Sequence, residues 1–117
     1  MERVDIKDFQ KLDIKIGTIK KAEVPEWSHW VMKLTVDLGS PPAGGGERTI
    51  FAGIMKFYKP EDLEGRQFPF IVNLEPKKIG PEGDFSEGMM LMADIGDETP
   101  PTLLIPAKKV PAGTKVH

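Results

Sequence analysis

The chain has 117 residues, of which 39% are hydrophobic and 29% are charged, and its formal net charge is −2. These values are typical of one globular domain with a single core, and no apolar run is long enough to cross a bilayer. The N-terminal sequence lacks the apolar stretch of a secretory signal, so we expect a cytoplasmic protein. The chain has no cysteine and its two histidines, His29 and His117, are too few for a usual structural zinc site.

Charge is unevenly distributed along the chain. A net negative charge argues against a nucleic-acid binder, because lysine and arginine contacts to phosphates normally supply most of the affinity. Residues 48–81, however, hold six basic and four acidic side chains, whereas residues 82–100 hold six acidic side chains and no basic one. A local basic surface and an ordinary solvated surface of mixed charge both remain open at this point.

Two segments in the first third of the chain have the alternation of strands. In residues 11–24 the apolar positions change phase after Gly17, which predicts a long strand bent by a bulge at that glycine. Residues 30–38 predict a second strand whose buried face holds Met32, Leu34, Val36 and Leu38.

The middle of the chain predicts a hairpin followed by one short helix. Residues 39–47 are rich in glycine and proline and predict a long, mobile hairpin tip before a third strand at 47–53. In residues 54–65, Pro60 suits the first turn of a helix and Gly65 suits its end.

The last part of the chain returns to strand patterns. Residues 67–74 predict a fourth strand with Phe68, Phe70, Val72 and Leu74 on one face, and Pro69 suggests an edge or irregular strand. Residues 89–95 predict a fifth strand with Met89, Leu91, Ala93 and Ile95 on one face, and a short segment, TLLIP at 102–106, follows an acidic turn.

This order of elements predicts an all-β fold: a five-stranded OB-fold barrel with one short helix between strands three and four. We expect a single domain over residues 1–117, with the barrel at about 8–96 and a C-terminal extension at 97–117. A different small β-barrel is the alternative.

The residues needed for catalysis are scarce. No cysteine is present, one of the two histidines is the last residue, and the glycines at 44–46 are not followed by the Lys-Ser/Thr pair of a phosphate-binding loop. The acidic residues lack the spacing of a cation-binding loop. We therefore expect no catalytic residue, no bound metal and no cofactor.

Basic and aromatic side chains are the better candidates for a binding site, because OB-folds present strands two and three to oligonucleotides or oligosaccharides. The basic residues on or beside these elements are Lys33, Arg48, Lys56, Lys59, Lys77 and Lys78. Taken singly, each of them is better explained as ordinary surface charge. We expect Trp30 to be packed, whereas Trp27 is open between a stacking platform, a dimer contact and a lid over the barrel end.

Several stretches in a fixed order carry a family resemblance along nearly the whole chain. They are DFQKLDIKIGTIKKAE, MKLTVDLG, RTIFAGI, FYKPEDLEG, IVNLEPKKIG, FSEGMMLMA and TLLIPAKKVPAGTKV. Together they resemble the tRNA-binding domain family, which occurs as the C-terminal appendix of methionyl-tRNA synthetases and as free-standing dimeric tRNA-binding proteins.

The resemblance implies a module that holds the outer corner of folded tRNA without reading much sequence, through electrostatic and shape-based contacts. It also implies a homodimer and a methionyl-tRNA synthetase as a partner. The residues that match the family's binding pattern are Asn73, Lys77, Lys78, Ser86, Gly88 and Met89. The alternatives are an asparagine that turns the backbone, a serine that caps a turn and, for Met89, the preferred expectation of a side chain that fills the core.

A related branch of small secretion-associated chaperones shares the length and the YKPE segment of this chain, and VPEW before SHW is similar to that branch. Its dimers are thought to hold unfolded polypeptide. That function is the second hypothesis. A domain that only joins synthetase subunits is the third.

Overall fold

The computed structural model describes residues 1–41, 44–96 and 98–117. Its elements, in chain order, are α1 (Ile6–Gln10), β1 (Ile14–Glu23), β2 (Met32–Asp37), β3 (Glu47–Ala52), α2 (Pro60–Leu63), β4 (Gln67–Ile71), β5 (Lys77–Ile79), β6 (Asp84–Ser86), β7 (Met89–Met90), β8 (Met92–Ala93), β9 (Thr102–Leu103) and β10 (Thr114–Val116). The described residues contain no helix long and apolar enough to span a membrane. Part of the expected mobile tip, residues 42 and 43, lies outside the described residues.

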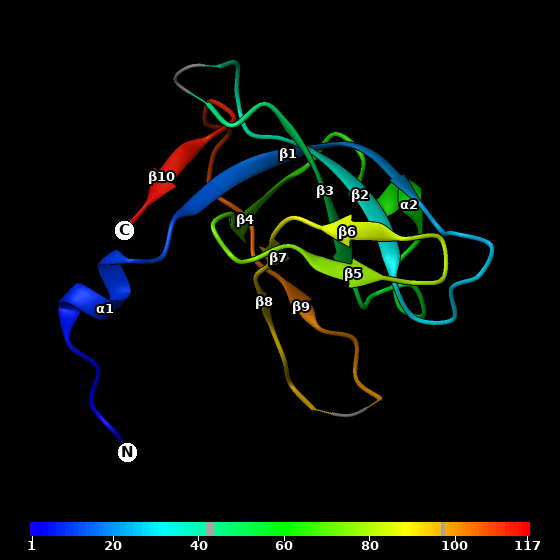
Figure 1. Cartoon of the computed structure of the whole chain (residues 1–117), viewed down its shortest axis with the longest axis horizontal. Coiled ribbons are helices and arrows are strands. Elements are labelled where there is room, and N and C mark those ends of the chain that lie inside the picture. Colours follow the sequence, from blue (N-terminus) through cyan, green and yellow to red (C-terminus); the bar gives the residue numbers. More distant parts are fainter. Residues whose placement is uncertain (42–43, 97) are drawn as a thin grey trace.

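The strands curl into a barrel (Figure 1). The main sheet is antiparallel in the order β3-β2-β1-β4-β7. The barrel closes where β3 meets the chain between β6 and β7, because the Glu87 N–H donates to the Thr49 carbonyl at 2.8 Å. The five-stranded barrel and its short helix between β3 and β4 are therefore confirmed.

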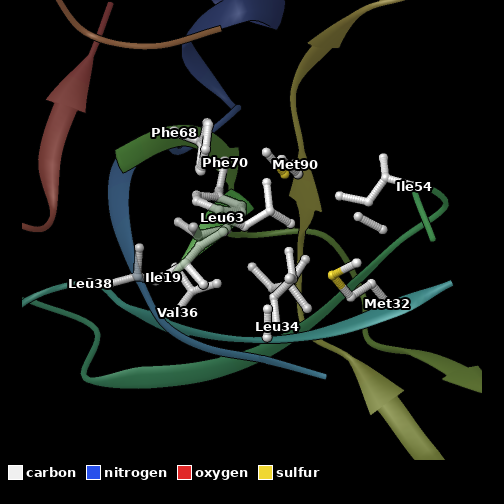
Figure 2. Packing of buried hydrophobic residues seen from close by; sticks show 14 residues of the cluster. Ile19, Met32, Leu34, Val36, Leu38, Ile54, Leu63, Phe68, Phe70 and Met90 are labelled. Carbon is white, nitrogen blue, oxygen red and sulfur yellow. The ribbon is translucent and has the colours of Figure 1, made fainter. Parts of the chain in front are cut away.

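The core fills the interior of this barrel (Figure 2). Side chains from β1, β2, β4, β7 and α2 meet there, among them Ile19, Leu34, Leu63, Phe68 and Met90. Burying each large apolar side chain contributes about 1.5–3 kcal/mol. The face predicted for 30–38 is confirmed, since all four of its apolar residues are fully buried.

The bulge in β1 lies three residues further along than expected. The register against β2 shifts between Ile19 and Lys21, not at Gly17. Gly17 has a different use: a Cβ there would lie 2.4 Å from Cγ1 of Val36. The glycine therefore lets β1 pass close to β2 inside the barrel.

The predicted face of 89–95 is wrong. Met90 is buried opposite Phe70 in the β4–β7 pair, whereas Met89 is 46% exposed and Ile95 is 66% exposed. The segment also divides into β7 and β8, and β8 pairs with β9 in a separate hairpin. Four consecutive apolar residues, MMLM, carry no alternation that could fix the face.

The C-terminal residues join the main sheet. β10 pairs with the first half of β1, with Val116 opposite Ile14. The side chain of Gln67 is buried and receives the Val110 N–H at 3.0 Å, while its amide donates to the Val110 carbonyl at 2.6 Å. β4 itself lies between β1 and β7, so the expectation of an edge strand from Pro69 is wrong.

Candidate nucleic-acid interface

The hairpin formed by β5 and β6 lies against β3 (Figure 1). Ser86 fixes it there, because its buried hydroxyl accepts the Phe51 N–H at 3.0 Å and donates to the Gly88 carbonyl at 3.1 Å. Glu87 adds a second attachment, since its carboxylate accepts the Thr49 N–H at 3.1 Å. These contacts give the hairpin a rigid base.

Trp27 fills the space beneath the turn of this hairpin. Its ring lies 6.2 Å from the ring of Phe51, and a Cβ at Gly80 would lie 2.4 Å from the Trp27 ring. Gly80 also has a φ of 76°, a conformation that favours glycine. The structure shows a role for Trp27 outside the three that the sequence left open, namely packing between the hairpin and β3.

Lys77 and Lys78 are exposed on β5. They are consecutive strand residues and therefore point to opposite faces of the hairpin, with Lys77 opposite Ser86 and Lys78 opposite Phe85. Among the described residues neither lysine has a carboxylate within ion-pair distance. Both ammonium groups are therefore open to a bound anion.

Lys33 reaches the same hairpin from β2. Its Nζ lies 3.9 Å from Oδ2 of Asp84, which starts β6. The pair links the barrel wall to the hairpin, and its partial exposure means that it contributes little to stability.

Asn73 lies in the segment that connects β4 to β5, just after β4 ends, and Arg48 of β3 contacts the same segment at Val72. The Asn73 side chain accepts the Asp13 N–H at 2.8 Å and donates to the Lys11 carbonyl at 2.7 Å, so it fixes the junction between α1 and β1. The Arg48 guanidinium donates to the carbonyl of Val72. Each of these two side chains has donors left over for a ligand.

Gly88 and Met89 follow the hairpin. Gly88 packs tightly, because a Cβ there would lie 2.7 Å from the Ile71 carbonyl oxygen. Met89 was expected to fill the core. Its side chain is instead exposed and lines a groove of about 670 Å³ together with Phe57 and Met92. It therefore belongs to a different surface from the lysines of β5.

Lys56 and Lys59 lie in the chain between β3 and α2. Both are exposed, and the Lys59 N–H donates to Oδ2 of Asp62 at 2.8 Å to start the helix. The neighbouring Trp30 is 55% exposed, so the expectation that it is packed is wrong. The hydrogen bonds and ion pairs that fix the hairpin involve neither lysine.

A groove of about 580 Å³ runs beside the hairpin, lined by Thr49, Pro76, Gly83, Asp84, Phe85 and Glu87. The ring of Phe85 is 52% exposed. An exposed ring beside basic side chains is a platform on which a base can stack. Phe85 was not among the expected site residues. Its place directly after the turn sequence Gly-Asp could have indicated an exposed aromatic ring.

Comparisons with known proteins give a consistent family. Residues 14–115 match the family model described as "Putative tRNA binding domain". The chain is 44% identical over 109 residues to methionine–tRNA ligase from Methanothrix thermoacetophila, which covers 93% of this chain and 15% of the ligase. The chain thus spans a small part of the relatives that it matches.

Solved structures agree. A MetRS related protein from Pyrococcus horikoshii superimposes with a TM-score of 0.87 at 38% identity and full coverage of both chains. The chaperone CsaA from Bacillus anthracis superimposes with a TM-score of 0.84 at 33% identity, covering 99% of this chain and 100% of that one. Because the family model matches residues 14–115, which are most of the chain, the chain belongs to the family of tRNA-binding domains.

Proposed function

We propose that the hairpin β5–β6 is the surface that binds tRNA, with Lys77 and Lys78 as its main phosphate contacts. The observation that carries the proposal is that two ammonium groups without an ion-pair partner in the described chain stand on a hairpin fixed to β3. A hairpin whose backbone is already fixed loses less conformational entropy when its lysines bind a phosphate.

The remaining side chains have supporting roles in this proposal. Lys33, Arg48 and Lys56 add positive charge around the barrel, and Asn73 and Ser86 hold the backbone on which the lysines stand. Gly88 and Met89 are adjacent to that backbone, and Phe85 offers a ring for a base. Because these contacts address phosphates and shape, we expect largely sequence-independent recognition of tRNA.

This module acts in the cytoplasm and carries out no catalysis of its own. By analogy with its relatives, it lends tRNA affinity to a methionyl-tRNA synthetase or acts as a free-standing protein. Residues 1–117 function as a single domain, and we infer that two copies form a homodimer.

The helix α1 is the surface that supports a homodimer. It buries none of its side chains, and Ile6 is 64% exposed. A groove of about 230 Å³ beside it is lined by Phe9, Leu12 and Val116. A second copy of the chain would cover these apolar groups, and closed symmetric dimers are the commonest assemblies.

A salt titration of tRNA binding tests the proposed function. We expect the affinity of the wild-type chain to fall steeply between 0.05 and 0.5 M KCl, measured by fluorescence anisotropy. Lys77→Ala with Lys78→Ala removes two phosphate contacts, which should lower the magnitude of the logarithmic salt slope by about 1.5. The matched variant, Lys77→Arg with Lys78→Arg, keeps the charge and should keep the slope. An alanine variant with an unchanged slope would exclude these lysines as phosphate contacts.

A second candidate function is the binding of unfolded polypeptide. It is favoured by the likeness to the chaperone CsaA and by the groove that Met89 shares with Phe57, Leu91 and Met92. Flexible methionine side chains adapt to varied apolar partners. This function predicts that the wild-type chain suppresses the aggregation of an unfolded client protein and that salt does not change the effect. Loss of this suppression in Met89→Asp would support the groove as the binding site. If Met89→Asp suppresses aggregation as well as the wild-type chain does, this groove is not the polypeptide-binding site.

A further inference from the structure

A groove of about 340 Å³ lies at the start of β4, at the opposite end of that strand from Asn73. It is lined by Arg66 and Gln67 on one side and by the C-terminal segment from Ile105 to Lys109 on the other. None of the residues matched to the family's binding pattern lies in it. Its position therefore makes it a separate surface from the hairpin.

The groove is cationic. Arg66, Lys108 and Lys109 are exposed, and the lining contains no carboxylate. In residues 1–41, 44–96 and 98–117 no acidic side chain forms an ion pair with any of the three. Three positive charges on one groove attract a polyanion even though the whole chain carries a net charge of −2.

Two acidic side chains that are close to Arg66 in sequence, Asp62 and Glu64, are engaged elsewhere. Oδ2 of Asp62 accepts the Lys59 N–H at 2.8 Å, and Oε2 of Glu64 accepts the Ala22 N–H at 3.0 Å. These carboxylates bind backbone amides and are not part of the groove lining. A phosphate in the groove therefore meets the cations before it meets an acid.

The Arg66 side chain and the backbone segment that carries the two lysines are held in place before any ligand binds. Arg66 donates from Nη1 to the Asp62 carbonyl at 2.9 Å, and its guanidinium carbon lies 5.3 Å from the centre of the Phe68 ring. Four of its five N–H donors are left for other partners. The buried Gln67 holds both backbone groups of Val110, which fixes the segment that carries Lys108 and Lys109 beside Arg66.

We propose that this groove, defined by Arg66, Lys108 and Lys109, is a second phosphate-binding site for RNA, used together with the hairpin β5–β6. The proposal rests on the tRNA-binding function proposed above. β4 is five residues long, so its two ends are about 13 Å apart. The groove lies at the start of this strand and the hairpin follows its end in the chain, so one folded RNA can contact both cationic sites, whereas a free phosphate would occupy only one. Exposed Ile105 supplies an apolar wall for a ribose or a base.

The test is tRNA binding by the full chain with Lys108→Ala and Lys109→Ala together. Both lysines are exposed, so alanine leaves the packing intact. Loss of two phosphate contacts should lower the magnitude of the salt slope by about 1.5 and weaken binding roughly 10- to 30-fold at 0.1 M KCl. The affinities of variant and wild type should converge as the salt concentration approaches about 1 M.

Two control variants isolate the groove. Lys108→Arg with Lys109→Arg keeps the charge and should keep both affinity and slope. Arg3→Ala with Lys7→Ala removes the same charge from the exposed N-terminal segment and should leave the slope unchanged. An equal loss in this second control would overturn the proposal, because the effect would then come from net charge.

The outcomes also separate this proposal from the proposed function. If Lys77→Ala with Lys78→Ala weakens binding while the groove variant binds as the wild type does, the groove is rejected and the function stands. If the wild-type chain shows no salt-dependent binding of tRNA, both fail. If the groove variant alone loses affinity, the groove is supported and the hairpin is rejected as the main site.

Discussion

Trp27 packs beneath the turn of the hairpin β5–β6 and so fixes the position of the strand that carries Lys77 and Lys78. The indole occupies the space that Gly80 leaves open, and its other side contacts Phe51 of β3. Any side chain at position 80 must displace either the ring or the turn. A single methyl group there therefore changes where Lys77 and Lys78 stand.

We expect Gly80→Ala to weaken tRNA binding, because the hairpin must shift to admit the Cβ. Emission from Trp27 should change as well, measured in a Trp30→Phe background. Gly83→Ala is the matched control: its φ of 81° imposes the same kind of backbone strain, but its Cβ would meet only Cε of Lys78 at 3.9 Å. Backbone strain alone should cost each variant about 1 kcal/mol of unfolding free energy, and the clash with Trp27 should add to the loss in Gly80→Ala. Equal tRNA affinities of the two variants would show that the contact between Trp27 and Gly80 does not determine the position of the binding lysines.

At the scale of elements, α1 is the one helix whose side chains all remain uncovered within the described residues. Asp5 starts it by accepting the Lys7 N–H at 2.8 Å, yet five residues are too few for a helix to be stable on its own. Its apolar residues therefore need a surface to cover them. The proposed homodimer supplies that surface.

We expect Ile6→Ser with Phe9→Ser to convert the dimer to a monomer in sedimentation velocity experiments, because it removes the exposed apolar groups of α1. Lys7→Ser changes a polar position on the same helix and should leave the dimer intact. A wild-type chain that sediments as a monomer at micromolar concentration would contradict the dimer itself.

The sequence predicted elements well wherever polar and apolar residues alternate. The segment of β2 alternates cleanly, and its predicted face is the buried one. β5 and β6 were not expected as strands, because the run PKKIGPEGDFS has no alternation and the hairpin depends on Trp27 and β3 for its position. α1 was missed for a similar reason, since it is too short to show a helical period.

The candidate site was only partly readable in advance. Lys77 and Lys78 are adjacent in sequence, so their shared position on one connector was evident. The cationic groove was not, because residues 43 positions apart form it, as the Gln67–Val110 hydrogen bonds show. No local pattern reveals a contact that the tertiary fold creates.

At the scale of the whole molecule, Gln67 joins the C-terminal segment to the barrel. Its side chain is buried, and it is the partner of both the N–H and the carbonyl of Val110. Since β10 also pairs with β1, the last residues belong to the same cooperative sheet as the first strand.

We expect Gln67→Ala to lower the free energy of unfolding by about 2 kcal/mol, because it leaves backbone groups of Val110 without a partner. Unfolding by urea should remain a single transition with coincident fluorescence and circular dichroism curves, as a single domain requires. Gln10→Ala, at an exposed position of α1, is the control and should be neutral. Two separate transitions in the wild-type chain would contradict the single domain.

The pairing of β10 with β1 also places the last strand of the chain beside the first one. Val116 lies opposite Ile14, and β10 and the C-terminus lie on the left of Figure 1, whereas the hairpin β5–β6 lies on the right. A fluorescent tag fused after β10 should therefore leave Lys77 and Lys78 free to bind RNA.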